Sequence, residues 1–156
     1  MLSRKRIEEE GKDLENALSL FKEYFIELNE NLCFQNFDDE LKHPLKKYGA
    51  PQGSIFIAYL EEKPAGCIAL QPIKEGICEM KRLYVKPAFR WSKIGEELVN
   101  VFLNDATEKG YKKMVLDTLE RLQPAIRVYQ RYGFHNTSAY YVNPLPGVVY
   151  MEKQLV

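Results

Sequence analysis

The spacing of apolar residues switches between helical and strand-like periods along the chain, and the order of these switches limits the fold more than any other feature. Apolar residues with helical spacing run from Leu14 to Leu28. Three β-prone runs follow, at 55–60, 65–70 and 77–85, and short turns separate them. The sequence therefore predicts a first helix followed by an antiparallel three-stranded meander.

The second half of the chain returns to helical spacing twice. A helix with Ile94, Leu98 and Phe102 on one face is expected after Pro87, and it should end at Gly110. The short apolar run 113–117 follows this crossover helix, so it can lie parallel to the preceding strand. A further helix is expected between Pro124 and Gly133, and two last strands at 134–141 and 148–155.

The N-terminal third is less regular. A short strand at 2–7 is left open, a short helix is expected at 37–41, and a turn-rich loop is expected from His43 to Gly53. With 156 residues and 18.2 kDa, the chain suits a single domain spanning 1–156.

Composition excludes some functions. Lys plus Arg and Asp plus Glu both total 22, so no global positive charge favours nucleic acid. The charged N-terminus lacks the apolar core of a secretory leader, and no run approaches the length of a membrane span; a cytoplasmic protein without a membrane partner is expected. Cys33, Cys67 and Cys78 show no metal-type spacing, and the last two are expected to be buried small apolar residues rather than catalytic thiols.

The turn between strand 77–85 and the next helix has the features of a phosphate site. A helix that begins directly after a short turn presents unpaired backbone N–H groups and the positive end of its dipole. Arg90 and Gly95 bracket the start of this helix. The segment therefore predicts binding of a phosphorylated ligand.

These residues resemble the GNAT (Gcn5-related N-acetyltransferase) superfamily. Its pyrophosphate loop reads Arg or Gln, two residues, Gly, one residue, then Gly or Ala; Arg90 matches the first position and Gly95 the last. Lys93 stands in place of the first glycine, and Trp91 where many members have another. The segment A-I-R-V-Y-Q-R-Y-G-F at 125–134 also resembles the superfamily's Ala-Ile-x-Leu-Tyr-x-x-x-Gly-Phe segment.

The resemblance implies a mixed α+β fold: a central, mostly antiparallel sheet with a parallel strand pair at the cofactor cleft, flanked by about four helices. It implies acetyl-CoA as donor, a small-molecule amine as acceptor and no metal, and it is compatible with a homodimer. Backbone groups of Leu83, Tyr84 and Val85 would hold the pantetheine arm. Thr118 either lines the same cleft or is a strand-end hydroxyl without a role. The loop residues implied to bind the cofactor are Arg90, Trp91, Ser92, Lys93, Ile94, Gly95 and Glu96.

Two side chains are candidates for acid and base catalysis. The resemblance gives Tyr129 the role of protonating the departing thiolate, which suits a phenol of pKa about 10 beside a thiol of pKa about 8.5. Glu79 lies where several superfamily members place a general base that deprotonates the amine. The alternative for Tyr129 is a packed aromatic, and for Glu79 a solvated or ion-paired carboxylate beside Lys81 and Arg82.

The acceptor should be recognised by variable segments on the fixed scaffold. Phe34, Gln35 and Phe37 after the first helix, and Tyr140 and Tyr141 before a Pro-rich turn, are the candidates; each aromatic taken singly could equally seal the core. His43 and His135 have no partner at catalytic spacing, so surface or capping roles are expected for them.

Two readings of the phosphate loop stay open. Lys93 either directs its ammonium at the phosphates over an intact nest of backbone amides, or it impairs that nest. The second reading, together with Trp91, motivates an alternative function: a binding module that holds acyl-CoA or a partner without turnover. A dinucleotide-binding oxidoreductase is disfavoured because no G-x-G-x-x-G follows any strand.

Overall fold

The computed structural model describes residues 1–32 and 35–155. In chain order, the elements are β1 (Leu2–Ile7), α1 (Lys12–Leu28), α2 (Phe37–Lys42), α3 (Pro44–Tyr48), β2 (Ser54–Leu60), β3 (Lys63–Lys74), β4 (Ile77–Val85), the 3₁₀-helix η2 (Pro87–Ser92), α4 (Ile94–Glu108), β5 (Lys113–Leu119), α5 (Gln123–Arg131), β6 (His135–Asn136) and β7 (Val148–Gln154).

The strands form one seven-stranded sheet in the order β1-β2-β3-β4-β5-β7-β6. Neighbouring strands are antiparallel except β4 and β5, which are parallel and are connected through α4. The expected mixed sheet with one parallel pair is thereby confirmed. Five α-helices and one 3₁₀-helix occur in the described part of the chain, compared with the expected four or so.

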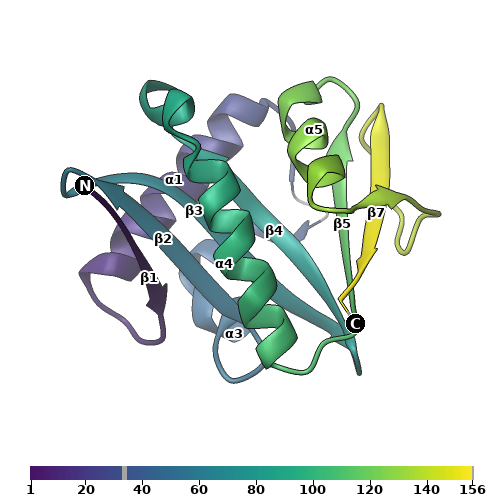
Figure 1. The fold of residues 1–156 in the computed structure, drawn as a ribbon, viewed down its shortest axis with the longest axis horizontal. Coiled ribbons are helices and arrows are strands. Elements are labelled where there is room, and N and C mark those ends of the chain that lie inside the picture. The colour runs from purple at the N-terminus through teal and green to yellow at the C-terminus, as the bar shows by residue number, and fades with distance from the viewer. Residues whose placement is uncertain (33–34, 156) are drawn as a thin grey trace.

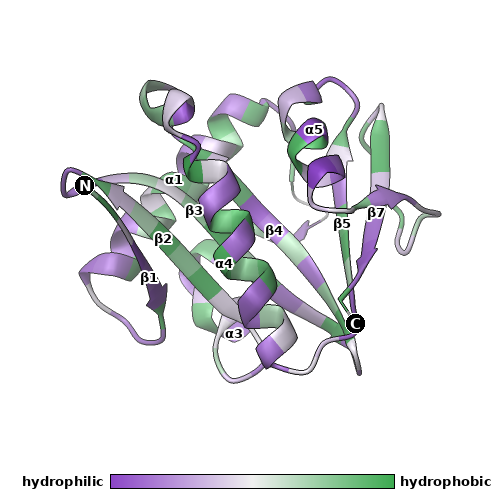
Figure 2. Cartoon of the chain, in the orientation of Figure 1, coloured by the Kyte–Doolittle hydropathy of each residue, from purple (hydrophilic) through white to green (hydrophobic). Residues whose placement is uncertain are grey.

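Helices cover both faces of the sheet (Figure 1). On one face, α4 and α5 pack over a core that includes Phe56, Leu98 and Phe102. On the other face, α1, α2 and α3 cover a second core that includes Phe21 and Tyr48. The apolar stripe of α4 turns toward the sheet while its polar residues face outward (Figure 2). The sheet is therefore the middle layer of three.

Gly66 allows α4 to lie close to β3. A Cβ added there would come within 2.8 Å of the Tyr84 carbonyl oxygen and within 3.1 Å of a Leu98 methyl group. Because only glycine fits this contact, the first turns of α4 are fixed against the sheet beside the carboxyl end of β4. This contact sets the position of the predicted phosphate loop.

Three sequence-based expectations were wrong in detail. The segment expected as a loop from 43 to 53 contains α3, which begins at Pro44 and buries Tyr48. Pro64, expected in the turn, lies within β3 at an irregularity opposite Tyr59. The strand expected at 134–141 pairs only at His135–Asn136, because the chain then leaves the sheet.

The remaining expectations concern helices and cysteines. Within the described residues, no helix combines the length and apolar character needed to cross a bilayer. Cys67 and Cys78 are buried and unpaired, and burial raises the pKa of both thiols, that of Cys78 to about 12. Both are therefore inert at neutral pH, as expected. Cys33 lies outside the described residues.

Candidate active site

The parallel strands β4 and β5 separate part-way along their length. Their register runs from Ile77 opposite Lys113 to Glu79 opposite Val115 and ends there. Beyond this fork, the strand edges of 80–85 and 116–119 face each other without pairing, and a cavity of about 70 Å³ lies between them. Backbone groups on these edges are available to a ligand, since a strand edge presents unpaired N–H and C=O groups.

A β-bulge in β4 changes which side chains reach this region. Lys81 pairs with Ala69 and Tyr84 with Cys67, so two residues of β4 lie opposite one residue of β3. Arg82, at the bulge, has a left-handed backbone with φ of 60°. The alternation of faces is interrupted, so that Glu79, Lys81 and Arg82 all point to the α1 side of the sheet.

Arg82 anchors the segment that precedes α2. Its guanidinium donates two hydrogen bonds of 2.8 Å to the Glu40 carboxylate and one of 2.9 Å to Gln35 Oε1. Lys47 donates to the same carboxylate at 2.9 Å. Burial alone would raise the pKa of Glu40, but Arg82 and Lys47 outweigh burial and lower it. Glu40 therefore stays ionised, and Gln35 is held in a fixed position.

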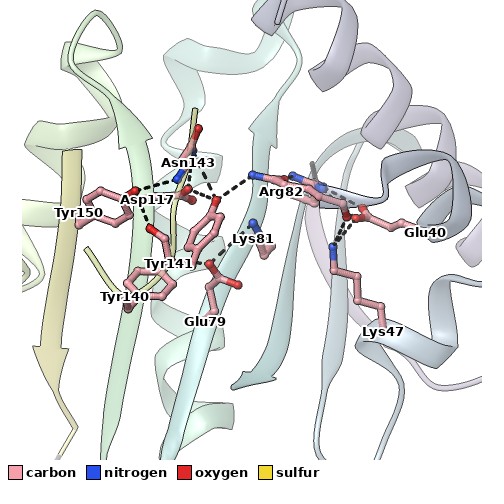
Figure 3. A network of polar contacts seen from close by, with 11 residues as sticks. Glu40, Lys47, Glu79, Lys81, Arg82, Asp117, Tyr140, Tyr141, Asn143 and Tyr150 are labelled. Atoms are coloured by element: carbon pink, nitrogen blue, oxygen red, sulfur yellow. Dashed lines mark hydrogen bonds and ion pairs between the residues drawn. The ribbon is translucent and has the colours of Figure 1, made fainter. Parts of the chain in front are cut away.

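Glu79 lies at the fork and is only 3% exposed. Tyr140 donates a hydrogen bond to its Oε2, and Lys81 Nζ lies 3.7 Å from the same oxygen (Figure 3). Burial raises the pKa of Glu79, and the Lys81 charge and the Tyr140 hydrogen bond offset part of this effect. A carboxylate with a raised pKa is a stronger base near neutral pH.

The segment 137–147 places two tyrosines over the strand ends. Tyr141 donates a hydrogen bond to Asp117 at the fork, and Gln35 donates to the Tyr141 hydroxyl at 3.2 Å. Asn143 donates to Asp117 at 2.8 Å, and Tyr150 donates to the Tyr141 carbonyl at 2.8 Å (Figure 3). These contacts explain why the segment leaves the sheet after β6.

A larger open cavity of about 520 Å³ lies between α2, α3, β3, β4 and this C-terminal segment. Gln35, Glu79, Tyr140 and Tyr141 line it, so four of the predicted site residues come together here. It meets the fork cavity at Gln35 and Lys81, which line both. This size is typical of small-molecule sites.

Phe37 is the exception among the expected acceptor residues. It lies in the core beneath α1, stacked on Phe25 with ring centroids 4.9 Å apart, and it lines neither cavity. Its contribution to the site is indirect, because its ring lies against the Arg82 guanidinium at 5.2 Å. Phe34 lies outside the described residues.

Tyr129 reaches the fork from α5. It is 7% exposed, packs edge-on against Phe134 and lines the fork cavity together with Thr118. Burial raises its pKa, so the phenol keeps its proton throughout the neutral range. A buried, protonated phenol beside a ligand cleft is suited to donate that proton.

The loop before α4 keeps the backbone of an anion-binding nest. The 3₁₀ turn η2 ends at Ser92, and Lys93 then takes a left-handed conformation with φ of 61° before α4 begins at Ile94. A right-handed residue followed by a left-handed one directs successive N–H groups to one point. The amides of 94–96 belong to the first helical turn and lack intrahelical acceptors.

The space beside the Cα atom of Gly95 is open, with no close protein neighbour within the described residues. A Cβ added there would meet only Val85 Cγ2, at an ordinary 3.6 Å. Packing within the described residues therefore does not require glycine at this position. Space remains for a ligand to approach the backbone.

Residues 14–134 match the acetyltransferase (GNAT) family. The chain belongs to this family. An uncharacterized N-acetyltransferase of Schizosaccharomyces pombe is 46% identical over 146 residues, which cover 92% of this chain and 90% of that protein. An uncharacterized N-acetyltransferase of Dictyostelium discoideum is 32% identical, and the match covers 89% of this chain and 93% of that protein.

Solved structures of GNAT proteins share the fold. An acetyltransferase from Streptococcus agalactiae superposes with a TM-score of 0.79 at 23% identity, covering 97% of this chain and 98% of that chain. A GNAT-family acetyltransferase from Staphylococcus aureus gives the same TM-score at 18% identity, covering 99% and 100%. At these identities, the comparison shows the common architecture.

The GNAT loop side chains mostly bond within the protein. Arg90 donates to the Val85 carbonyl at 2.9 Å and pairs with Glu27 at 2.5 Å. Trp91 is 78% exposed, with its indole N–H bonded to the Ala88 carbonyl, and Ser92 donates to the Phe89 carbonyl. Any phosphate contact from this loop would therefore come chiefly from backbone amides and Lys93, which is exposed.

The other predicted cofactor-binding residues lie along the edge of β4 and at the start of α4. Leu83, in the fork cavity, and Tyr84 and Val85 follow the unpaired edge of β4. The Ile94 side chain is buried in the core. The Glu96 carboxylate pairs with Arg131. Tyr132 donates to the Glu96 carbonyl and joins the start of α4 to the end of α5.

Sequence reasoning missed several residues of the site. Lys81, Arg82, Glu40 and Asp117 are part of its hydrogen-bonded and ion-paired network. His43 is exposed and stands at the cap position between α2 and α3, as expected, and it also lines the larger cavity; His135 lies on the surface, 3.9 Å from Glu152. Among the described residues, no cluster of His, Cys, Asp and Glu is arranged to hold a metal ion.

Proposed function

We propose that this chain is an N-acetyltransferase that transfers an acetyl group from acetyl-CoA to a primary amine of a small molecule. The amine attacks directly within a ternary complex. One observation carries the proposal: the fork between β4 and β5 joins a cleft beside Tyr129 to a larger cavity beside Glu79. Donor and acceptor would thus meet where a proton acceptor and a proton donor lie on either side.

The residues present fit acetyl-CoA. The nest at Lys93 and the amides at the start of α4 suit a diphosphate, and the space beside Gly95 admits it. The edge of β4 at Leu83, Tyr84 and Val85 does not pair with β5 and offers backbone partners for the amide groups of a pantetheine arm, apart from the Val85 carbonyl, which accepts from Arg90. When bound, acetyl-CoA would supply an activated thioester acetyl group.

Glu79 and Tyr129 divide the proton transfers. Glu79, directly or through a water, accepts one proton from the acceptor ammonium, leaving a nucleophilic amine. As the new C–N bond forms and the C–S bond breaks, Tyr129 donates its hydroxyl proton to the sulfur. The second amine proton returns to Tyr129 through solvent, and Glu79 releases its own proton, so one proton is released overall.

Backbone amides assist the same step. An N–H on the free edge of β4 would stabilise the negative charge that develops on the thioester oxygen. Lys81 lines the fork cavity and is itself only 6% exposed. Low exposure strengthens each of these electrostatic contacts.

The test has two stages. Calorimetry with coenzyme A measures donor binding, and a thiol-detection assay with acetyl-CoA then measures turnover over a broad panel of primary amines. Binding with turnover of at least one amine class is expected. Absence of binding at millimolar coenzyme A would overturn the proposal.

Binding without turnover would support the binding-module alternative, which the exposed Trp91 and the lysine at position 93 motivate. Trp91 is the single tryptophan of the chain, so its fluorescence provides a second readout of binding at the loop. A change in that fluorescence with coenzyme A would locate the ligand at the loop that precedes α4.

A further inference from the structure

Lys81 is a buried cation with unused hydrogen-bond donors. Its side chain is 6% exposed, and its Nζ lies 3.7 Å from Glu79 Oε2, an ion-pair distance that is too long for a strong hydrogen bond. Within the described residues, no hydrogen bond from its ammonium is found; its other close contact is the ring of Tyr141, 5.8 Å away. The ammonium has access to the cavities at the point where they meet.

Two other cations near this point, Arg82 and Lys47, already have partners. Arg82 is bonded to Glu40 and Gln35, and Lys47 is bonded to Glu40 and to the Gln35 carbonyl at 3.3 Å. Lys46 lies exposed on the rim of the larger cavity. Lys81 is therefore the buried cation best placed to bind an anion that enters the cavity.

We infer that Lys81 binds the carboxylate of an acceptor whose amine faces Glu79, so that the acceptor is an α-amino acid. This inference rests on the proposed function. An α-amino acid carries a positive and a negative group on neighbouring carbons, and Glu79 and Lys81 present the opposite signs side by side (Figure 3). Each charge of the zwitterion would meet its complement in a water-poor site.

The distribution of carboxylates disfavours polyamines. A second ammonium would need a second buried carboxylate, but Glu40 is bonded to Arg82 and Lys47. Asp117 accepts hydrogen bonds from Tyr141 and Asn143. Asp39 also lines the larger cavity but is exposed, so Glu79 is the buried carboxylate left to receive an amine. The cavity of about 520 Å³ has room for an amino-acid side chain against Tyr140 and Ile73.

The experiment compares free L-amino acids with their carboxamides, which keep the amine and the side chain but lose the carboxylate charge. Acetylation of each pair is measured as kcat/KM at saturating acetyl-CoA. For the preferred side chain, wild type should favour the amino acid by about tenfold or more, since a buried charge-assisted contact contributes at least about 1.5 kcal/mol.

The variant Lys81→Met keeps the length of the side chain and removes the charge. It should reduce the preference to within about twofold, mainly through KM for the amino acid. The pKa of Glu79 should rise in this variant, because the Lys81 charge lowers it, but this change affects both members of a pair and leaves their ratio unchanged. Lys42→Gln removes a charge from the exposed side of α2 and should leave the ratio as in wild type.

The outcomes separate the two proposals. The inference would be overturned if wild type acetylated amino acids and their carboxamides equally well. It would also be overturned if the preference for amino acids survived in Lys81→Met. Either result leaves the proposed function standing. Absence of turnover with every amine, despite bound coenzyme A, would overturn the proposed function. Calorimetry of wild type with the preferred amino acid and its carboxamide then tests Lys81 alone, and equal binding would overturn the inference.

Discussion

The hydroxyl of Tyr140 donates a hydrogen bond to Oε2 of Glu79, although the two residues are 61 positions apart in the chain. Glu79 comes from the middle of the sheet, and Tyr140 comes from the irregular segment that precedes β7. The C-terminal segment therefore tunes the basicity of a buried carboxylate that it does not itself carry.

Removing this hydrogen bond should shift the pH dependence of the reaction. Tyr140 stabilises the ionised form of Glu79 and so lowers the pKa of that carboxyl, which burial raises. In Tyr140→Phe the pKa of Glu79 should increase, since the ionised carboxylate loses a hydrogen bond that stabilises it. The base works only when ionised, so the rising limb of kcat/KM should move to higher pH.

Tyr150→Phe is the matched control for this shift. Tyr150 also lies beside Tyr140, with ring centroids 5.6 Å apart, but its hydroxyl bonds to the Tyr141 carbonyl rather than to Glu79. Its profile should keep the wild-type midpoint. If the rising limb of the kcat/KM profile stays at the wild-type pH in Tyr140→Phe, Glu79 is not the base whose ionisation controls the rate.

Tyr129→Phe should lower kcat by about 100-fold, because a positioned general acid commonly contributes that much. Coenzyme A affinity should change little, since the hydroxyl acts on the leaving sulfur. Tyr111→Phe, which loses a bond to the Gln52 carbonyl away from both cavities, should retain wild-type kcat. Wild-type turnover in Tyr129→Phe would remove Tyr129 from the mechanism.

Lys93→Gly tests what the residue at the nest contributes. A left-handed lysine is strained by about 1–2 kcal/mol, and glycine costs part of that in chain entropy, so the variant should be more stable by about 0.5–1 kcal/mol in urea unfolding. If the ammonium contacts phosphate, coenzyme A binding should weaken severalfold in both Lys93→Gly and Lys93→Ala. Unchanged affinity in both would assign the phosphate contact to backbone amides alone.

Much of the architecture follows from local pattern. The helical spacing at α1, α4 and α5 and the strand runs at β2, β4 and β5 were all predicted, because each buries one face or both. The parallel pairing of β4 and β5 followed from the crossover helix between them. Pro44 shows the limit of such reasoning: the same residue that indicates a turn also begins a short helix.

The site was harder to predict because it depends on the bulge at Arg82. Apolar residues of β4 recur at Cys78, Met80, Leu83 and Val85, so their alternation slips by one position. That slip is visible in the sequence, and it signals that consecutive charged residues share a face. Their partner Glu40 could not be inferred, since nothing local links it to a strand 42 positions away.

The gap in the sheet has a mechanical consequence. The portion from β1 to β4 and the portion from β5 to β7 share three residue pairs of backbone register and separate beyond them. A molecule lying along the open edges would bridge the two portions as an inserted strand does. Its arrival would stiffen the protein across this short junction, so that ligand occupancy and rigidity rise together.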